Sequence, residues 1–104
     1  MNEYAITITT CANKENAKAI GRELVKKRLA ACVQLFPIES IYTWMGEICE
    51  EAEVVLFIKS KTAAFEQIAA SIKECHSYDL PEIIQIPITK GMPEYLRWID
   101  ELTN

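Results

Sequence analysis

The stretch ACVQLFPIESIYTWMGEICEEAEVVLFIKS, residues 31–60, decides the fold of this chain. It predicts two long strands joined near Trp44, Met45, Gly46 and Glu47. Pro37 interrupts the first strand, and because proline has no N–H to donate, it should mark a bulge or a sheet edge. In VVLFI, residues 54–58, apolar side chains occupy both faces of the second strand. Both faces of this strand must therefore be covered.

Upstream of this hairpin, the sequence predicts a strand and a helix. YAITITT alternates apolar side chains with threonine, so Tyr4, Ile6 and Ile8 share one face of a half-buried strand that runs to about Thr10. Asn13 can cap a helix with apolar residues at near-helical spacing. These are Ala17, Ile20, Leu24 and Leu29.

Downstream of the hairpin, apolar residues recur at helical spacing from Phe65 to Ile72, which predicts a helix ending near Cys75. A strand is expected over Glu82–Thr89, where Pro87 again suggests an edge, and Pro93 opens a last helix. The order is βαββαβ with a C-terminal helix. This is the α+β, ferredoxin-like arrangement with a long β-hairpin, in a single domain over residues 1–104.

The apolar character of both faces of VVLFI predicts a homo-oligomer. In a small two-layer domain the helices cover only one face of the sheet, so another copy of the chain is the simplest cover for the second.

Composition excludes several classes of protein. The formal charge of −4 argues against a nucleic-acid partner, which requires clustered Lys and Arg. No apolar run approaches the roughly 20 residues of a membrane span, and no signal core is present, so a cytoplasmic location is expected. The four cysteines form no CxxC pair and are expected to be reduced.

The predicted topology brings unusual residues to one end of the sheet. They come from the end of the first strand (Thr10, Cys11), the end of the second helix (Cys75, His76) and the start of the fourth strand (Glu82). Thiolate and imidazole are ligands that suit copper and zinc. An alternative is that the His76 ring packs against the helix stripe and donates one hydrogen bond.

Other roles for these residues remain open. Glu82 could pair with Lys59, and Trp44 and Trp98 are more typical of core or interface anchors than of ligand platforms. Cys75 or Cys11 with His76 as base would form a nucleophile pair. No glycine-rich oxyanion turn, phosphate loop or nucleophile elbow accompanies them, so we do not expect an enzyme.

Four segments resemble the CutA family of divalent-cation tolerance proteins, along essentially the whole chain. They are RLAACVQLFPIESIYTWMGEI, EEAEVVLFIKSKT, HSYDLPEII and EYLRWI. The resemblance implies a ferredoxin-like subunit in a tightly packed homotrimer, similar in architecture to the PII signalling proteins. It also implies binding of copper or another divalent cation in the metal-ion response, and no catalytic reaction.

In the bacterial family members for which copper ligands are proposed, these are a cysteine near the end of the first strand and two adjacent histidines. The resemblance places them at Thr10, Cys75 and His76 here, with Cys11 next to Thr10. Two thiolates and one imidazole form a soft set that favours Cu(I). Cys11 should face away from Thr10 in a regular strand, so it is the weakest member of this set.

The competing hypothesis is a PII-like signalling or scaffold trimer, which binds a small anionic effector or a protein partner without a physiological metal. Its cleft would hold Trp44, Lys59, Tyr78 and Glu82.

Overall fold

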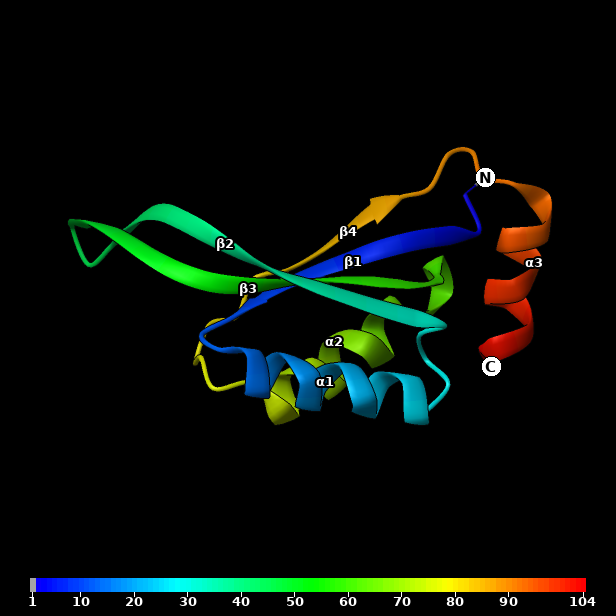
Figure 1. The fold of residues 1–104 in the computed structure, drawn as a ribbon, viewed down its shortest axis with the longest axis horizontal. Helices are drawn as coiled ribbons and strands as arrows, with labels where there is room; N and C mark the ends of the chain where they lie inside the picture. The colour runs from blue at the N-terminus through cyan, green and yellow to red at the C-terminus, as the bar shows by residue number, and fades with distance from the viewer. Residues whose placement is uncertain (1) are drawn as a thin grey trace.

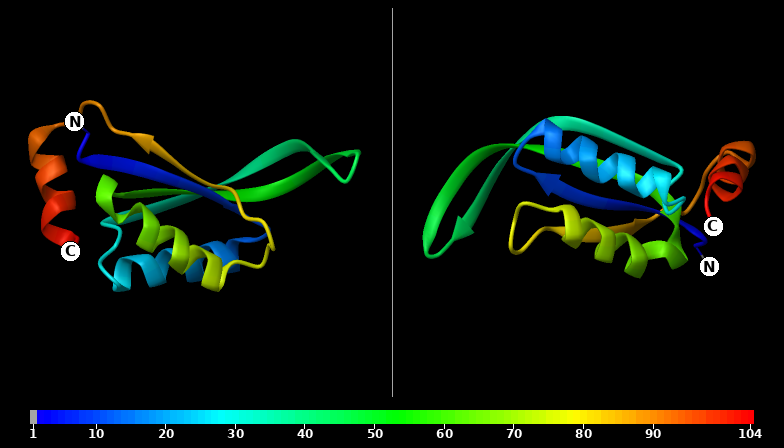
Figure 2. Two further views of the ribbon diagram at one scale, coloured as in Figure 1. Left: turned by 180° about the vertical axis from the view of Figure 1, so that it is seen from behind. Right: turned by 90° about the horizontal axis from the view of Figure 1, so that it is seen from below.

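The computed structural model describes residues 2–104. Its elements, in chain order, are β1 (Tyr4–Cys11), α1 (Lys14–Lys26), β2 (Cys32–Trp44), β3 (Glu47–Lys61), a short 3-10 turn η1 (Thr62–Ala64), α2 (Phe65–Cys75), β4 (Ile83–Pro87) and α3 (Pro93–Leu102). The strands form one antiparallel sheet in the order β2-β3-β1-β4. Helices α1 and α2 both lie against one face of this sheet, and α3 stands beyond its end (Figures 1 and 2). The predicted α+β, ferredoxin-like topology is confirmed.

The two long strands form a hairpin that projects from the body of the molecule (Figure 1). Its turn places Met45 at φ 51° and Gly46 at φ 80°. Two consecutive positive φ angles are typical of the turn that matches the right-handed twist of the strands. The hairpin contributes to a long axis of 45 Å, against 25 and 22 Å for the other two.

Helix α1 begins where Asn13 caps it, because the Asn13 side chain accepts a hydrogen bond from the Asn16 N–H at 2.8 Å. Its apolar stripe packs against the sheet together with Ile68 and Ile72 of α2, both fully buried. The buried stripe of α1 consists of Ala17, Ile20, Gly21 and Leu24. The core therefore lies between the two helices and the sheet.

In β1 the face that carries the threonines is more deeply buried than the face that carries the isoleucines, the reverse of what side-chain polarity alone predicts. Ala5, Thr7, Thr9 and Cys11 are buried, whereas Tyr4, Ile6 and Ile8 are only partly buried. Strand geometry puts these two sets on opposite faces. The threonines face the helices, where the Thr7 and Thr9 hydroxyls lack a hydrogen-bond partner within residues 2–104. The isoleucines face the side of the sheet without helices, called the open face below.

The prolines lie where the sequence predicts an edge. Pro37 is in β2 and Pro87 is in β4, the two outer strands. The register continues unbroken through Pro37, which is paired with Val54, so Pro37 marks an edge and not a bulge. Strand β4, Ile83–Pro87, is shorter than the predicted Glu82–Thr89.

Within residues 2–104, no helix is long and apolar enough to cross a membrane.

Candidate functional site

The residue that follows α2, His76, joins three segments of the chain. Its backbone leaves the helix with φ −80° and ψ 141°, which turns the ring toward the end of β1. The His76 Nε2 lies 2.7 Å from the carbonyl oxygen of Thr10, and the Tyr78 N–H donates to Nδ1 at 3.0 Å. The predicted meeting of the β1 end with the α2 end is confirmed.

These contacts fix the tautomer of His76. A carbonyl oxygen only accepts, so the nitrogen beside Thr10, Nε2, carries the proton and donates it. Nδ1 accepts from a backbone N–H and is therefore the unprotonated nitrogen. Both ring nitrogens are occupied in this arrangement. This geometry fits the alternative in which the His76 ring packs and donates one hydrogen bond. The ring also accepts a second hydrogen bond, at Nδ1.

Cys11 lies beside the same nitrogen, with its Sγ 3.8 Å from the His76 Nε2. The Cys11 side chain is fully buried in the core cluster. Burial raises the pKa of this thiol to about 11, and the negative charge of Glu53 adds to the effect. The thiol is therefore protonated at neutral pH. As predicted, Cys11 faces the helices while Thr10 faces the other side of the sheet.

Cys75 is held mainly by its backbone. The Asn16 side-chain amide donates to the Cys75 carbonyl at 2.9 Å, which ties the start of α1 to the end of α2. The partly buried Cys75 side chain packs against the core. Within residues 2–104, no three His, Cys, Asp or Glu side chains are grouped closely enough to hold a metal ion.

On the open face at the same end, a cleft of about 440 Å³ separates the hairpin from the loop before β4. It is lined by Thr10, Ser40, Ile41, Tyr42, Trp44, Glu53, Tyr78, Leu80 and Glu82. The Tyr78 hydroxyl donates to Glu53 Oε2 at 2.6 Å, and its ring lies 4.9 Å from the His76 ring, centroid to centroid. Burial, followed by the hydrogen bond to Glu53, raises the Tyr78 pKa above its usual range.

Three of the four residues predicted for the effector cleft, Trp44, Tyr78 and Glu82, do line it. Lys59 does not line it. The ion pair that Glu82 could have formed with Lys59 is not present: the ion pairs within residues 2–104 are Lys27–Glu23 and Lys61–Asp100. Lys59 is paired with Ile6, toward the other end of β1. Its Nζ donates to the Tyr95 hydroxyl of α3 at 3.3 Å and lies 5.4 Å from the centre of the Tyr95 ring.

The sequence reasoning missed Glu53. Its signal was present, because Glu53, Val55 and Phe57 alternate along β3 and must share the open face. Trp44 and Trp98 are 52% and 40% exposed, so neither is a core residue of the single chain.

Comparison with known proteins shows the family of this chain. Residues 5–102 match the family model described as "CutA1 divalent ion tolerance protein". The chain belongs to the CutA1 family. The divalent-cation tolerance protein CutA of Thermus thermophilus is 41% identical over 100 residues, which cover 95% of this chain and 97% of that protein.

Solved CutA structures share the fold. The structure of the periplasmic divalent cation tolerance protein CutA from Archaeoglobus fulgidus superimposes with a TM-score of 0.94 at 37% identity, and the match covers 95% of this chain and 97% of that one. Protein CutA of Mus musculus is 42% identical over 96 residues, 91% of this chain. The CutA1 chain described here matches only 54% of the length of that mouse protein.

Proposed function

We propose that this protein acts in divalent-cation tolerance as a cytoplasmic homotrimer without a catalytic role. The observation that carries the trimer is the apolar open face of the sheet. Phe36, Ile84 and Ile86 are 44%, 48% and 44% exposed there. Pairing across the sheet places Phe57 and Ile8 beside them on the same face.

A monomer would leave this face in water. The chain's helices α1 and α2 lie on the opposite side, and soluble monomers rarely expose large contiguous apolar patches. A second copy presents the same apolar surface, so association of identical subunits buries it. Three copies are proposed because the family resemblance implies a homotrimer.

The oligomer is tested by sedimentation and light scattering. Wild-type protein should have three times the 11.8 kDa mass of the chain. Ile84→Lys should dissociate it, because it places a charge within the buried interface. Val25→Lys is the matched control, since Val25 is 45% exposed but lies on α1. A monomeric wild type, or an intact trimer in Ile84→Lys, would contradict the proposal.

The metal proposal rests on the Cys11 and His76 pair. Their Sγ–Nε2 separation of 3.8 Å is less than the sum of typical metal–sulfur and metal–nitrogen bonds, about 4.3 Å, so the distance suits one shared ion. Binding requires the His76 ring to turn, because Nε2 is directed at the Thr10 carbonyl in the ion-free arrangement. Thiolate and imidazole favour copper. In the ion-free arrangement both donors carry protons, so each must lose its proton before it can act as a ligand. Within residues 2–104 no third His, Cys, Asp or Glu side chain is grouped with these two. The other positions that the family resemblance gives for ligands are Thr10 and Cys75.

An anaerobic Cu(I) titration against a chromogenic competitor tests the site in the reduced protein. We expect one bound ion per subunit and an affinity that rises with pH, because ligand protons are released. Cys11→Ser and His76→Ala should each weaken binding, whereas Cys49→Ser, on the hairpin, should not. Equal affinity in all four proteins would exclude this site.

The effector alternative has weaker support. Lys59 lies outside the cleft, while Glu53 and Glu82 give the cleft negative charge, which opposes an anionic effector.

The proposed absence of a catalytic role is supported by Cys11. Its buried, protonated thiol is a poor nucleophile.

A further inference from the structure

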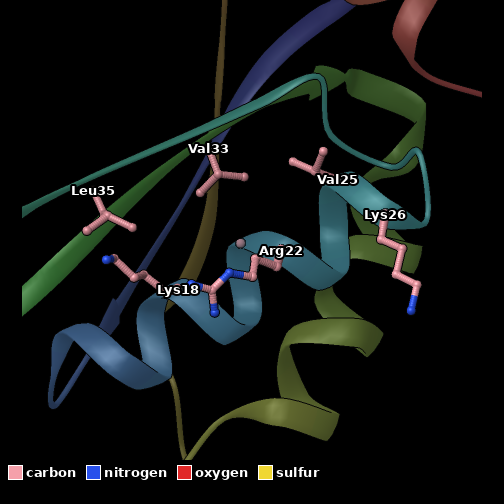
Figure 3. A pocket seen from close by; sticks show the side chains of 7 residues that line it. Lys18, Arg22, Val25, Lys26, Val33 and Leu35 are labelled. Carbon is pink, nitrogen blue, oxygen red and sulfur yellow. The ribbon is translucent and has the colours of Figure 1, made fainter.

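A second concave surface lies between α1 and the edge strand β2, on the helix side of the sheet (Figure 3). This groove is shallow and open to solvent, with a volume of about 480 Å³. Its apolar floor is formed by Gly21, Val25, Val33 and Leu35, and its rim by Lys18, Arg22 and Lys26. It shares no residue with the Cys11–His76 pair or with the cleft on the open face.

The three cationic residues of the rim all come from helix α1. Lys18, Arg22 and Lys26 recur every four residues and therefore follow one side of α1. Neither ion pair within residues 2–104 involves them. In Figure 3, Lys18 and Arg22 extend along the groove near Leu35, whereas Lys26 points away from β2. This concentration of positive charge stands out in a chain whose formal charge is −4.

The other end of the groove is apolar. Val25 of α1 and Val33 of β2 lie on its two sides (Figure 3). Gly21 lets α1 pack closely against β2 at this point, because a Cβ there would lie only 3.2 Å from Val33 Cγ1. Val25 is 45% exposed despite this apolar setting. The groove thus has a cationic end and an apolar end.

We propose that this groove binds an amphipathic organic anion of the medium-chain carboxylate class. The carboxylate lies between Lys18 and Arg22, and the alkyl chain lies along Val33 and Val25. Small inorganic anions leave the apolar floor uncovered, and cationic amphipaths are repelled by the rim. The proposal is independent of the metal site and of the cleft.

The test is a calorimetric titration of the intact protein with decanoate below its micelle concentration. Octanoate and hexanoate provide a series in which each added CH₂ should tighten binding about fourfold. Decyltrimethylammonium and acetate, which each lack one half of the ligand, should not bind. Methyl resonances of Val25 and Val33 should shift on titration with decanoate.

Charge reversal locates the site. The double variant Lys18→Glu, Arg22→Glu should weaken decanoate binding at least about tenfold, because two attractive charges become repulsive. Both side chains are exposed, so the fold should persist. Lys14→Glu, on the same helix but outside the groove, is the control and should bind normally. Absence of decanoate binding, equal binding of decyltrimethylammonium, or an unaffected double variant would each overturn the proposal.

Discussion

Replacing His76 with alanine should destabilise the metal-free protein. The variant loses the bond from Nε2 to the Thr10 carbonyl and the bond from the Tyr78 N–H to Nδ1. A net value of about 1 kcal/mol for each hydrogen bond gives a loss of about 2 kcal/mol per subunit. Both partners are backbone groups in a partly buried setting, so their desolvation is no longer compensated.

Urea unfolding followed by circular dichroism measures this loss. Wild type and variant are compared at equal concentration, because the stability of the proposed oligomer would depend on it. Ser77→Ala is the control: Ser77 is exposed, and its one side-chain bond, to Asn16, is long at 3.5 Å. It should stay within about 0.5 kcal/mol of wild type. A His76→Ala variant equally close to wild type would refute the structural role assigned to the ring.

Three further predictions follow from the site and the hairpin. The Cys11 thiol has a pKa near 9 when unfolded and about 11 when folded, so its contribution to stability is complete below pH 9 and is lost as pH rises to 11. Cys11→Ala should therefore flatten this part of the pH–stability curve. An unchanged curve would contradict the prediction. Tyr78→Phe should cost about 1 kcal/mol in urea unfolding through loss of the bond to Glu53, and no cost would show that this bond is not formed in solution. Gly46→Ala should cost about 1 kcal/mol from its positive φ alone, because a Cβ there meets no atom within 4 Å; a larger loss would indicate a hidden contact.

Much of the fold could be predicted from sequence because its signals are periodic. The alternation in YAITITT and the apolar VVLFI run gave two strands, and the edge positions of Pro37 and Pro87 followed from the missing N–H. Periodicity alone could not decide which face of β1 the helices cover. In the structure the helices cover the threonine side, and the isoleucine side lies on the open face.

The site was predictable only in outline. Topology brought Thr10, Cys11 and His76 to one end of the sheet, since the ends of strands and helices follow from their order. The tautomer of His76 depends on a backbone carbonyl and an amide, which carry no sequence signal. Lys59 was misplaced because it is a charge on an otherwise apolar strand, which suggested Glu82 as a partner. The residue that it contacts, Tyr95, comes from the C-terminal helix.

The two edge prolines limit how large an assembly of this chain can become. A sheet with exposed outer strands and a broad apolar face has what a fibril requires, namely a template for added strands and a driving force for stacking. The register runs unbroken through Pro37, and Pro87 ends β4, so each edge strand keeps its pairing to the sheet while including a residue without an N–H. A strand approaching either edge meets a pyrrolidine ring in place of a donor. Each edge of the sheet thus carries a residue that opposes polymerisation along the sheet.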